Sequence, residues 1–294
     1  MILPYFLHKL NKMTYFIRKN KVLIFISFAV LSVGFRVYAE ETIQYFNEKL
    51  TISFLLNYNY GSFYQDNTEH ITVRPVNVGF GVRYKNISAS ASFPIPFKDT
   101  SFDLEINPYF ERIYYHAYFK YYQDFYKRDQ DEKSDLDILS SAITATYVLN
   151  HENHSLSSVI NLDKKQTVSS GSFLYSFGTF FSSIFSETIE NYHERRQNLL
   201  YFGPGIGYSY TFVFENDMFL NLSVVVFTNA GINLNNKEWS FIPQLEPHIV
   251  FGQHKKTWSF NIKIANNSEF ILGEQSNYDI LTLSSISAVL SKRF

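Results

Sequence analysis

Apolar and polar residues alternate one by one along four consecutive stretches of this chain, residues 76–85, 87–93, 101–111 and 113–124. In the third stretch the apolar Phe102 and Leu104 occupy even-numbered positions, while the acidic Asp103 and Glu105 occupy the odd-numbered positions between and after them. We call the two sets of alternate positions the apolar and the polar parity. Successive side chains of a strand point to opposite faces of its sheet, so this pattern indicates strands with one apolar and one polar face. Only Arg112 separates the last two stretches, and we predict that they form a hairpin.

After Glu40 no apolar run reaches the roughly twenty residues that a membrane-spanning helix needs. Alternating strands can cross a bilayer only as a closed barrel. The sequence therefore predicts an all-β fold, an antiparallel up-and-down transmembrane β-barrel of about 12 strands, within a range of about 10 to 14. A soluble β-sandwich is the alternative fold.

The alternation continues in the second half of the chain, over residues 202–226 and 239–264. We expect further, weaker strands at residues 50–59, 138–149, 155–163, 170–180 and 281–294. The charged residues 127–137 are expected to form an extracellular loop, and residues 182–198 a loop or a short helix.

The composition fits a barrel and excludes several classes of protein. The chain has 30 Phe and 22 Tyr at a mean hydropathy of −0.13, as expected if many rings lie on a surface that lipid covers. Cys is absent, so there is no disulfide and no thiolate metal site. A net charge of −1 argues against nucleic acid as a partner. We expect no cofactor.

Residues 1–39 have the order of a cleavable export signal. Basic residues, including Arg18 and Lys19, precede an apolar run from Val22 to Phe35, and Ala39 closes the segment before Glu40. The same segment allows a translation start at Met13. We expect residues 40–294 to form one outer-membrane barrel domain of a bacterial protein.

The last residue is Phe294, and it follows Leu290, Ala288 and Ile286 at alternating positions. This ending resembles the signal by which outer-membrane barrels are recognised for insertion. The resemblance implies outer-membrane lipid and the barrel-insertion machinery as partners.

Several blocks are similar to an uncharacterised bacterial family, domain of unknown function 4421, whose members are thought to form outer-membrane barrels. The similar blocks are residues 74–85, 100–104, 109–126, 169–174 and 205–213. The resemblance implied by these blocks would extend over nearly all of the chain after the expected export signal. No block is a catalytic signature, so the resemblance implies a fold and a location and no activity.

The polar parity of the expected strands carries charges of both signs. The candidates for lining the lumen are Arg83, Lys85, Asp103, Glu105, His116, Lys120, Glu246, His248 and Lys263. They are expected either to line a selective pore or, as the structural alternative, to pair across neighbouring strands and fill a narrow barrel.

No motif in the chain indicates a catalytic, metal or cofactor site. His151 and His154 have the wrong spacing for the helical zinc motif, and we expect both to lie in a solvated turn. The Gly-rich residues 202–207 run into an alternating strand rather than a helix, which argues against a phosphate loop. No Gly-x-Ser-x-Gly elbow is present.

Three functions remain open on the sequence. The first is a porin-like channel for small solutes, which the mixed charges of the polar parity favour. The second is a structural or surface-interaction barrel with a blocked lumen, which the inward Tyr114, Tyr118 and Tyr122 favour. The third is a membrane-embedded lipid-modifying enzyme, for which only polar His and Ser residues speak. We expect the protein not to be an enzyme.

Overall fold

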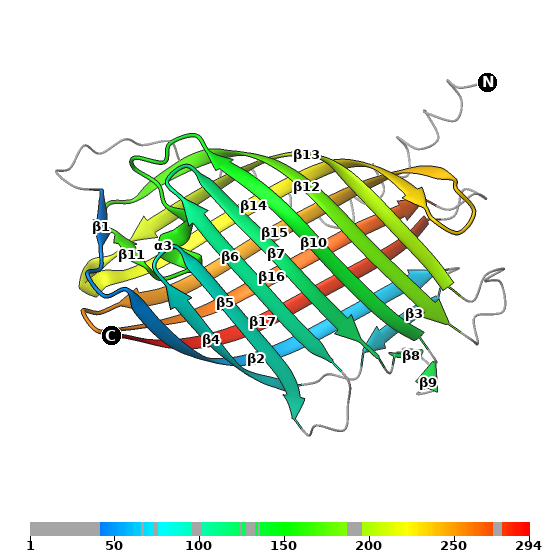
Figure 1. Ribbon diagram of the computed structural model, residues 1–294, viewed down its shortest axis with the longest axis horizontal. Coiled ribbons are helices and arrows are strands. Elements are labelled where there is room, and N and C mark those ends of the chain that lie inside the picture. Colours follow the sequence, from blue (N-terminus) through cyan, green and yellow to red (C-terminus); the bar gives the residue numbers. More distant parts are fainter. Residues whose placement is uncertain are drawn as a thin grey trace. The chain divides into compact units, whose positions relative to one another are not determined.

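Twelve long strands form the wall of the molecule in a computed structural model (Figure 1). The structure describes residues 42–65, 68–72, 76–95, 101–123, 125–127, 133–134, 136–186, 196–272 and 278–294. The expected export signal, with its alternative start at Met13, lies outside these residues, as do parts of the two expected loops. The strands of the wall are β2 (Leu50–Gln65), β4 (Val76–Tyr84), β5 (Ile87–Ile95), β6 (Phe102–Phe110), β7 (Ile113–Tyr122), β10 (Leu136–Val148), β12 (Ser170–Ser186), β13 (Arg196–Val213), β14 (Met218–Asn233), β15 (Trp239–His254), β16 (Trp258–Leu272) and β17 (Tyr278–Arg293).

The wall is a closed antiparallel barrel. Each of its strands pairs with the next one along the wall, and β17 pairs with β2, with Arg293 opposite Thr51 and Ile280 opposite Tyr64. The backbone of Phe294 completes the closure, because its N–H donates to the Leu50 carbonyl at 2.9 Å. The predicted fold and strand number are confirmed, and the β-sandwich is wrong.

The two faces of each strand differ as the alternation predicts. Large apolar side chains on the outer face remain exposed, for example Phe80 at 67% and Ile143 at 66%. Inward side chains of neighbouring positions are buried, such as Asn77 and Ser140, both at 0%. An exposed apolar outer face with a polar inner face is the arrangement of a barrel in lipid. No helix among the described residues has the length and apolar character needed to cross a membrane.

Replacing the outward Phe119 by Arg is expected to prevent assembly, while Phe119→Leu assembles normally. Phe119 is 40% exposed on the apolar outer face of β7. A positive charge at such a position costs roughly 2–4 kcal/mol near the bilayer midplane. The amount of heat-modifiable protein in the membrane fraction measures assembly. Equal amounts for the two variants would show that this face does not meet lipid.

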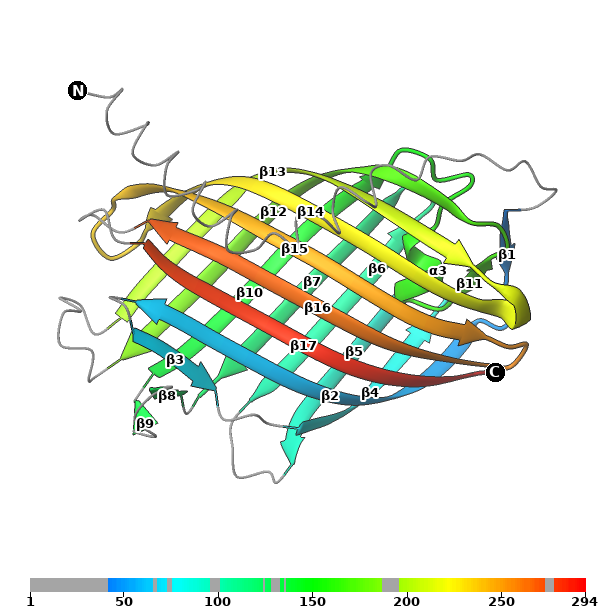
Figure 2. The same cartoon turned by 180° about the vertical axis from the view of Figure 1, so that it is seen from behind.

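The two ends of the barrel differ in their connections. Short turns at residues 85–86, 111–112, 214–217 and 255–257 lie at one end, which we call the turn end. The C-terminus, β1 (Ile43–Tyr45) and β11 (Lys164–Gln166) lie at this same end (Figure 2). At the other end, the loop end, β3 (Thr68–Thr72), β8 (Phe125–Lys127) and β9 (Lys133–Ser134) extend the sheet beyond β2.

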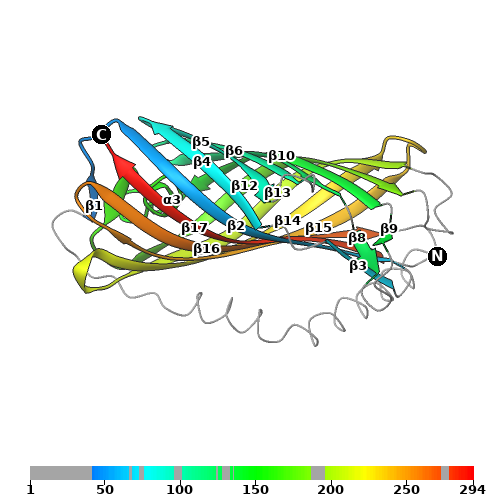
Figure 3. The same ribbon diagram turned by 90° about the horizontal axis from the view of Figure 1, so that it is seen from below.

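The expected strand at residues 155–163 is wrong, because the chain turns inward there. This stretch contains the helix α3 (Leu156–Ile160) and belongs to the long connection between β10 and β12. Leu156, Val159 and Ile160 have the helical spacing i, i+3, i+4. The hydroxyl of Ser155 caps the helix by accepting the Ser158 N–H at 3.2 Å. Figure 3 shows α3 at the end where the C-terminus lies.

Candidate functional site

Residues 150–169, which we call the plug, fold into the barrel at its turn end. Polar contacts bind the plug to strands on opposite sides of the wall. The Asn161 amide donates to the Asn107 carbonyl of β6 at 3.1 Å and accepts from the Ser88 hydroxyl of β5 at 2.9 Å. Across the lumen, the Asn261 amide of β16 donates to the Val159 carbonyl at 3.3 Å.

Apolar contacts of the plug reach further strands. Leu156 packs in one buried cluster with Tyr109, Val148 and Leu174, which lie on β6, β10 and β12. A second cluster joins the plug to β14 and β15 through Val159, Leu162, Phe219 and Val250. Since β5, β6, β10, β12, β14, β15 and β16 all contact the plug, this segment fills the bore at the turn end.

The first described residues hold the plug at the turn end of the barrel. Residues 42–46, the strap, include β1, which pairs antiparallel with β11 of the plug. Further bonds run from the Phe46 N–H to the Asp163 carbonyl at 3.2 Å and from the Thr167 N–H to the Thr42 carbonyl at 3.0 Å. The guanidinium of Arg293 lies 3.5 Å from the centroid of the Phe46 ring, which ties the strap to the end of β17.

Lys164 lies under the strap between two aromatic rings. Its Nζ is 4.7 Å from the Tyr45 ring centroid and 4.4 Å from that of Tyr109. The side chain is 3% exposed, and burial lowers the pKa of its ammonium, which the neighbouring Asp163 partly offsets. The strap, the plug and the wall therefore meet at one buried cation.

His154 is buried in the plug, so the expectation of a solvated turn is wrong for this residue. It is 0% exposed, and its Nδ1 lies 3.2 Å from the Ser170 carbonyl. Burial lowers the pKa of the imidazole to about 4 from an ordinary value of 6.5. Neutral His154 donates from Nδ1 to this carbonyl, while Nε2 finds no partner among the described residues.

Acidification from pH 7 to about pH 4.5 is expected to loosen the plug. The unfolded segment binds a proton at His154 below pH 6.5, whereas the folded plug does not until about pH 4, so the stability present at pH 7 falls across this interval. The free energy of unfolding of the plug is expected to fall by up to about 3 kcal/mol. The protection factors of plug amides, which take the intrinsic exchange rate at each pH into account, should fall more in the wild type than in His154→Asn. Equal falls would contradict the role of His154.

A second closure fills the lumen toward the loop end. Phe180 stacks on Tyr201 with centroids 5.2 Å apart and meets Phe227 edge to face, also at 5.2 Å. These rings belong to a continuous buried cluster, which we call the apolar layer. Its members are Phe63, Tyr118, Tyr122, Phe125, Leu136, Ile138, Ala142, Phe180, Ile184, Leu199, Tyr201, Phe227, Ile242, Leu281 and Leu283. All but Phe125 come from the inner faces of the barrel strands, near the ends that face the loops.

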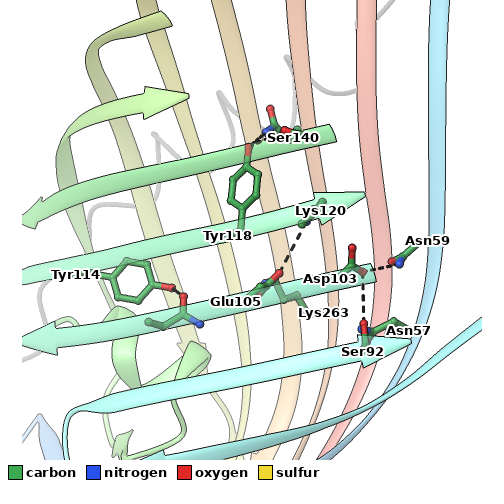
Figure 4. Close-up of polar contacts among 12 residues, drawn as sticks. Asn57, Asn59, Ser92, Asp103, Glu105, Tyr114, Tyr118, Lys120, Ser140 and Lys263 are labelled. Atoms are coloured by element: carbon green, nitrogen blue, oxygen red, sulfur yellow. Dashed lines mark hydrogen bonds and ion pairs between the residues drawn. The ribbon is translucent and has the colours of Figure 1, made fainter. Parts of the chain in front are cut away.

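Between the plug and the apolar layer, the lumen is polar and charged. Glu105 lies 3.8 Å from the ammonium of Lys120 on the neighbouring β7 and 3.8 Å from that of Lys263 across the barrel on β16 (Figure 4). Asp103 accepts from the Asn59 amide at 2.6 Å instead of pairing with a lysine. Polar side chains from opposite walls therefore meet in the middle of the bore.

Two more carboxylates lie deeper toward the apolar layer. Glu269 accepts from the Ser182 hydroxyl at 3.0 Å, and Glu246 accepts from the Gln244 amide at 2.7 Å. Gln244 also donates to Asn267 at 2.9 Å. These bonds connect β16 to β12 through Glu269 and to β15 through Asn267.

A cavity of about 100 Å³ lies between this charged region and the plug. We call it the chamber. Plug residues 159–162 form one side, and inward residues of β2, β4, β5, β6, β16 and β17 form the others. Small side chains on β5, such as Ser88, Ser90 and Ser92, leave this space open.

The structure places most of the predicted lumen residues on inner faces, in two groups. Arg83 is 5% exposed and donates to Thr51 and to the Glu48 and Lys85 carbonyls near the turn end. Lys85 does not face the lumen. It lies in the exposed turn after β4 with a φ of 52°, because β4 ends one residue earlier.

The middle of the lumen brings the others together. Glu105, Lys120 and Lys263 form ion pairs, and Asp103 is opposite Lys120 in the ladder. The side chains of Asp103, His116, Glu246 and His248 lie on the inner faces of β6, β7 and β15 in the same part of the lumen. Phe294 points outward and is 61% exposed.

One Ser–His pair, which the sequence pattern did not indicate, lies near the turn end. The Nδ1 of His254 is 3.0 Å from the Ser259 hydroxyl, and Arg293 donates to the same oxygen at 2.9 and 2.7 Å. Ser259 is 0% exposed, and the His254 ring stacks on Phe219. This contact joins the β15–β16 turn to the end of β17 and is closed to a substrate.

Among the described residues, no group of three or more His, Cys, Asp or Glu side chains is arranged to hold a metal ion. The plug contacts were not predicted from the sequence. The signals in the sequence that could have indicated them are the Ser155 cap and the helical spacing of Leu156, Val159 and Ile160. The apolar layer was visible only in part, through the inward parity of Tyr118 and Tyr122.

Solved structures of bacterial outer-membrane proteins resemble this barrel. A bacterial polysaccharide outer membrane secretin is 10% identical, with 87% of this chain and 100% of that chain covered and a TM-score of 0.36. A loop-deletion mutant of the outer membrane protein OmpT of Vibrio cholerae is 8% identical, with coverages of 83% and 100% and a TM-score of 0.29. The toluene transporter TodX of Pseudomonas putida is 7% identical, with coverages of 87% and 90% and a TM-score of 0.28.

These scores are too low to assign an activity or a ligand. A search of the curated proteins finds no match. A family model, in contrast, matches residues 40–289, which is most of the chain. The chain therefore belongs to the family described as Domain of unknown function (DUF4421).

Proposed function

We propose that this protein is an outer-membrane barrel with a closed lumen, which acts through its two ends rather than as an open pore. The observation that carries the proposal is the presence of two separate closures, the plug at the turn end and the apolar layer toward the loop end. The exposed apolar outer face and the export signal support the location.

The size of the barrel makes such closure feasible. Side chains alone fill a barrel of about eight strands, whereas sixteen or more leave an aqueous channel. A twelve-stranded wall lies between these sizes, so additional material is needed to fill the bore. Here the plug and large inward rings such as Phe180 and Tyr201 supply it.

The ends of the barrel offer different surfaces. Single-chain outer-membrane barrels have short periplasmic turns and longer extracellular loops. The turn end with the plug and the strap would then face the periplasm, and the loop end with β3, β8 and β9 would face outward. A structural or surface-interaction role would use the loop end.

Current recordings in planar bilayers test this proposal. The wild-type protein is expected to show no conductance. Outer-membrane fractionation of the same protein checks the location. Steady open-pore currents from the wild type would contradict the closed lumen and favour a porin-like channel instead.

A second candidate function is a gated passage for small polar solutes, in which the plug moves. The charged middle of the lumen favours it, because Glu105, Lys120 and Lys263 would offer a polar solute both signs of charge in the bore. Replacing the plug by a short Gly-Ser turn distinguishes the two. Currents after this deletion alone would favour the gated passage, and silence would favour the closed barrel.

A further inference from the structure

The chamber between the plug and the charged region has the features of a binding site for an ion. Its volume of about 100 Å³ has room for several water-sized groups. Its lining is rich in oxygen atoms from hydroxyl and amide side chains, including Ser53, Asn57, Ser92, Asn107 and Ser287. The plug closes it on one side, so an occupant would be enclosed by protein.

Buried oxygen acceptors in the chamber wall have no hydrogen-bond partner. They are the Oδ1 atoms of Asn57, Asp103 and Asn261, whose residues are 8%, 7% and 4% exposed. Leaving a buried acceptor without a partner is unfavourable, so such atoms indicate an occupant that contacts oxygen. The Oδ1 of Asn59, beside Asp103, is also without a partner.

Hydrogen bonds fix the orientation of these oxygens (Figure 4). The Asn57 amide nitrogen donates to the Ser92 hydroxyl at 3.1 Å, and the Asn59 amide nitrogen donates to Asp103 Oδ2 at 2.6 Å. Ser92 itself lies 3.5 Å from Asp103 Oδ2. With their nitrogens used in this way, both amides leave their carbonyl oxygens for another partner, next to one carboxylate.

Asp103 has no direct ion pair among the described residues. Glu105 lies 3.8 Å from both Lys120 and Lys263, while Lys120 lies opposite Asp103 in the ladder. The chamber lining has two carboxyl groups, Asp103 and Glu105, and two basic side chains, Arg83 and Lys263. Because the guanidinium of Arg83 donates to Thr51 and to backbone carbonyls near the turn end, Asp103 is the carboxyl group of this lining that has no basic partner at ion-pair distance among the described residues.

We propose that the chamber binds a hard monovalent cation, such as sodium or potassium, beside Asp103. Carboxylate and amide oxygens are the ligands that hard cations prefer. A carboxylate with no direct ion pair suits a single positive charge. Asp103 Oδ1 and Asn57 Oδ1 would contact the ion, Asn59 would hold the carboxylate in place through its bond to Asp103 Oδ2, and the chamber leaves room for the water of the ion. This site is independent of whether the barrel conducts.

Anomalous diffraction with rubidium as the probe tests the site directly. The full chain, refolded and crystallised in rubidium chloride, is expected to show a rubidium peak in the chamber beside Asp103. Asp103→Asn should lose the peak. Asp137→Asn is the matched control, because Asp137 lies on the outer face of β10, where it accepts from Tyr121, and should keep the peak.

A measurement in solution supplies a second readout. At equal salt concentration, potassium chloride should raise the unfolding temperature of the wild type by several degrees over choline chloride, and this difference should vanish in Asp103→Asn. If Asp103→Asn does not fold, Asn57→Ala replaces it, with a weaker peak and a smaller difference expected. Water alone in the wild-type chamber, or a peak that persists in Asp103→Asn, overturns the proposal.

Discussion

Replacing Phe180 by Ala is expected to lower the free energy of unfolding by about 3–5 kcal/mol. Phe180 is 1% exposed at the centre of the apolar layer and contacts the rings of Tyr201 and Phe227. Its removal leaves a cavity that the closed wall cannot collapse to fill, because the strands around it are fixed by their ladders. Urea unfolding of the protein in lipid vesicles measures the loss.

Phe177→Ala is the matched control for this prediction. Phe177 lies on the same strand, but its side chain points outward and is 54% exposed. Its truncation removes a contact with lipid and leaves no internal cavity, so a smaller effect is expected. Equal effects of the two substitutions would show that the apolar layer is not packed as described.

Glu105→Gln is expected to lower the free energy of unfolding by about 3–5 kcal/mol. Glu105 holds both Lys120 and Lys263 at 3.8 Å, and the three side chains are only 16–24% exposed. The substitution leaves two enclosed ammonium groups without their carboxylate. The same unfolding measurement applies, and adding Lys263→Met to Glu105→Gln should recover part of the loss, because one unpaired charge is removed.

The ion pair of Lys165 with Asp217 at the turn end is the comparison for Glu105. Its atoms are 2.7 Å apart, which is closer than in the Glu105 pairs, but Asp217 is 40% exposed. Exposed pairs contribute about 0–1 kcal/mol, so Asp217→Asn should have little effect. A loss for Glu105→Gln as small as that for Asp217→Asn would mean that water, rather than the lysines, neutralises Glu105.

The barrel could be predicted from the sequence because its wall has a strict two-residue period. A shift of one residue would place Asp103 and Glu105 in lipid and Phe102 and Leu104 in the lumen, so each strand allows one register. Hence the parity that put Lys120 inside the barrel agrees with its ion pair to Glu105.

The plug could not be predicted in this way, because its position depends on contacts between distant segments. Leu156 packs against Tyr109 and Leu174, and Asn261 bonds the chain more than a hundred residues earlier. A five-residue helix has too few turns for its apolar period to stand out beside the alternation of strands. The burial of His154 follows from the same inward fold.

The pairing inside the lumen was also beyond the sequence. The parity placed Glu105 and Lys263 on inner faces, and the up-and-down order puts β6 and β16 on opposite sides of the wall, but neither shows which side chains of the two strands meet across the bore. The sequence also could not show that Lys120 pairs with Glu105 rather than with Asp103. Asp103 is directly opposite Lys120 in the ladder, but its carboxylate accepts from Asn59 instead.

The central claim is that two independent closures block the lumen, and combined removal of both tests it most directly. Single-channel currents are compared for the wild type, the plug deletion, the triple variant Phe180→Ala, Tyr201→Ala and Phe227→Ala, and the combination of the last two. The closed-barrel account predicts silence from the first three and ion currents from the combination alone. Steady currents from the wild type, or from the plug deletion by itself, would contradict it.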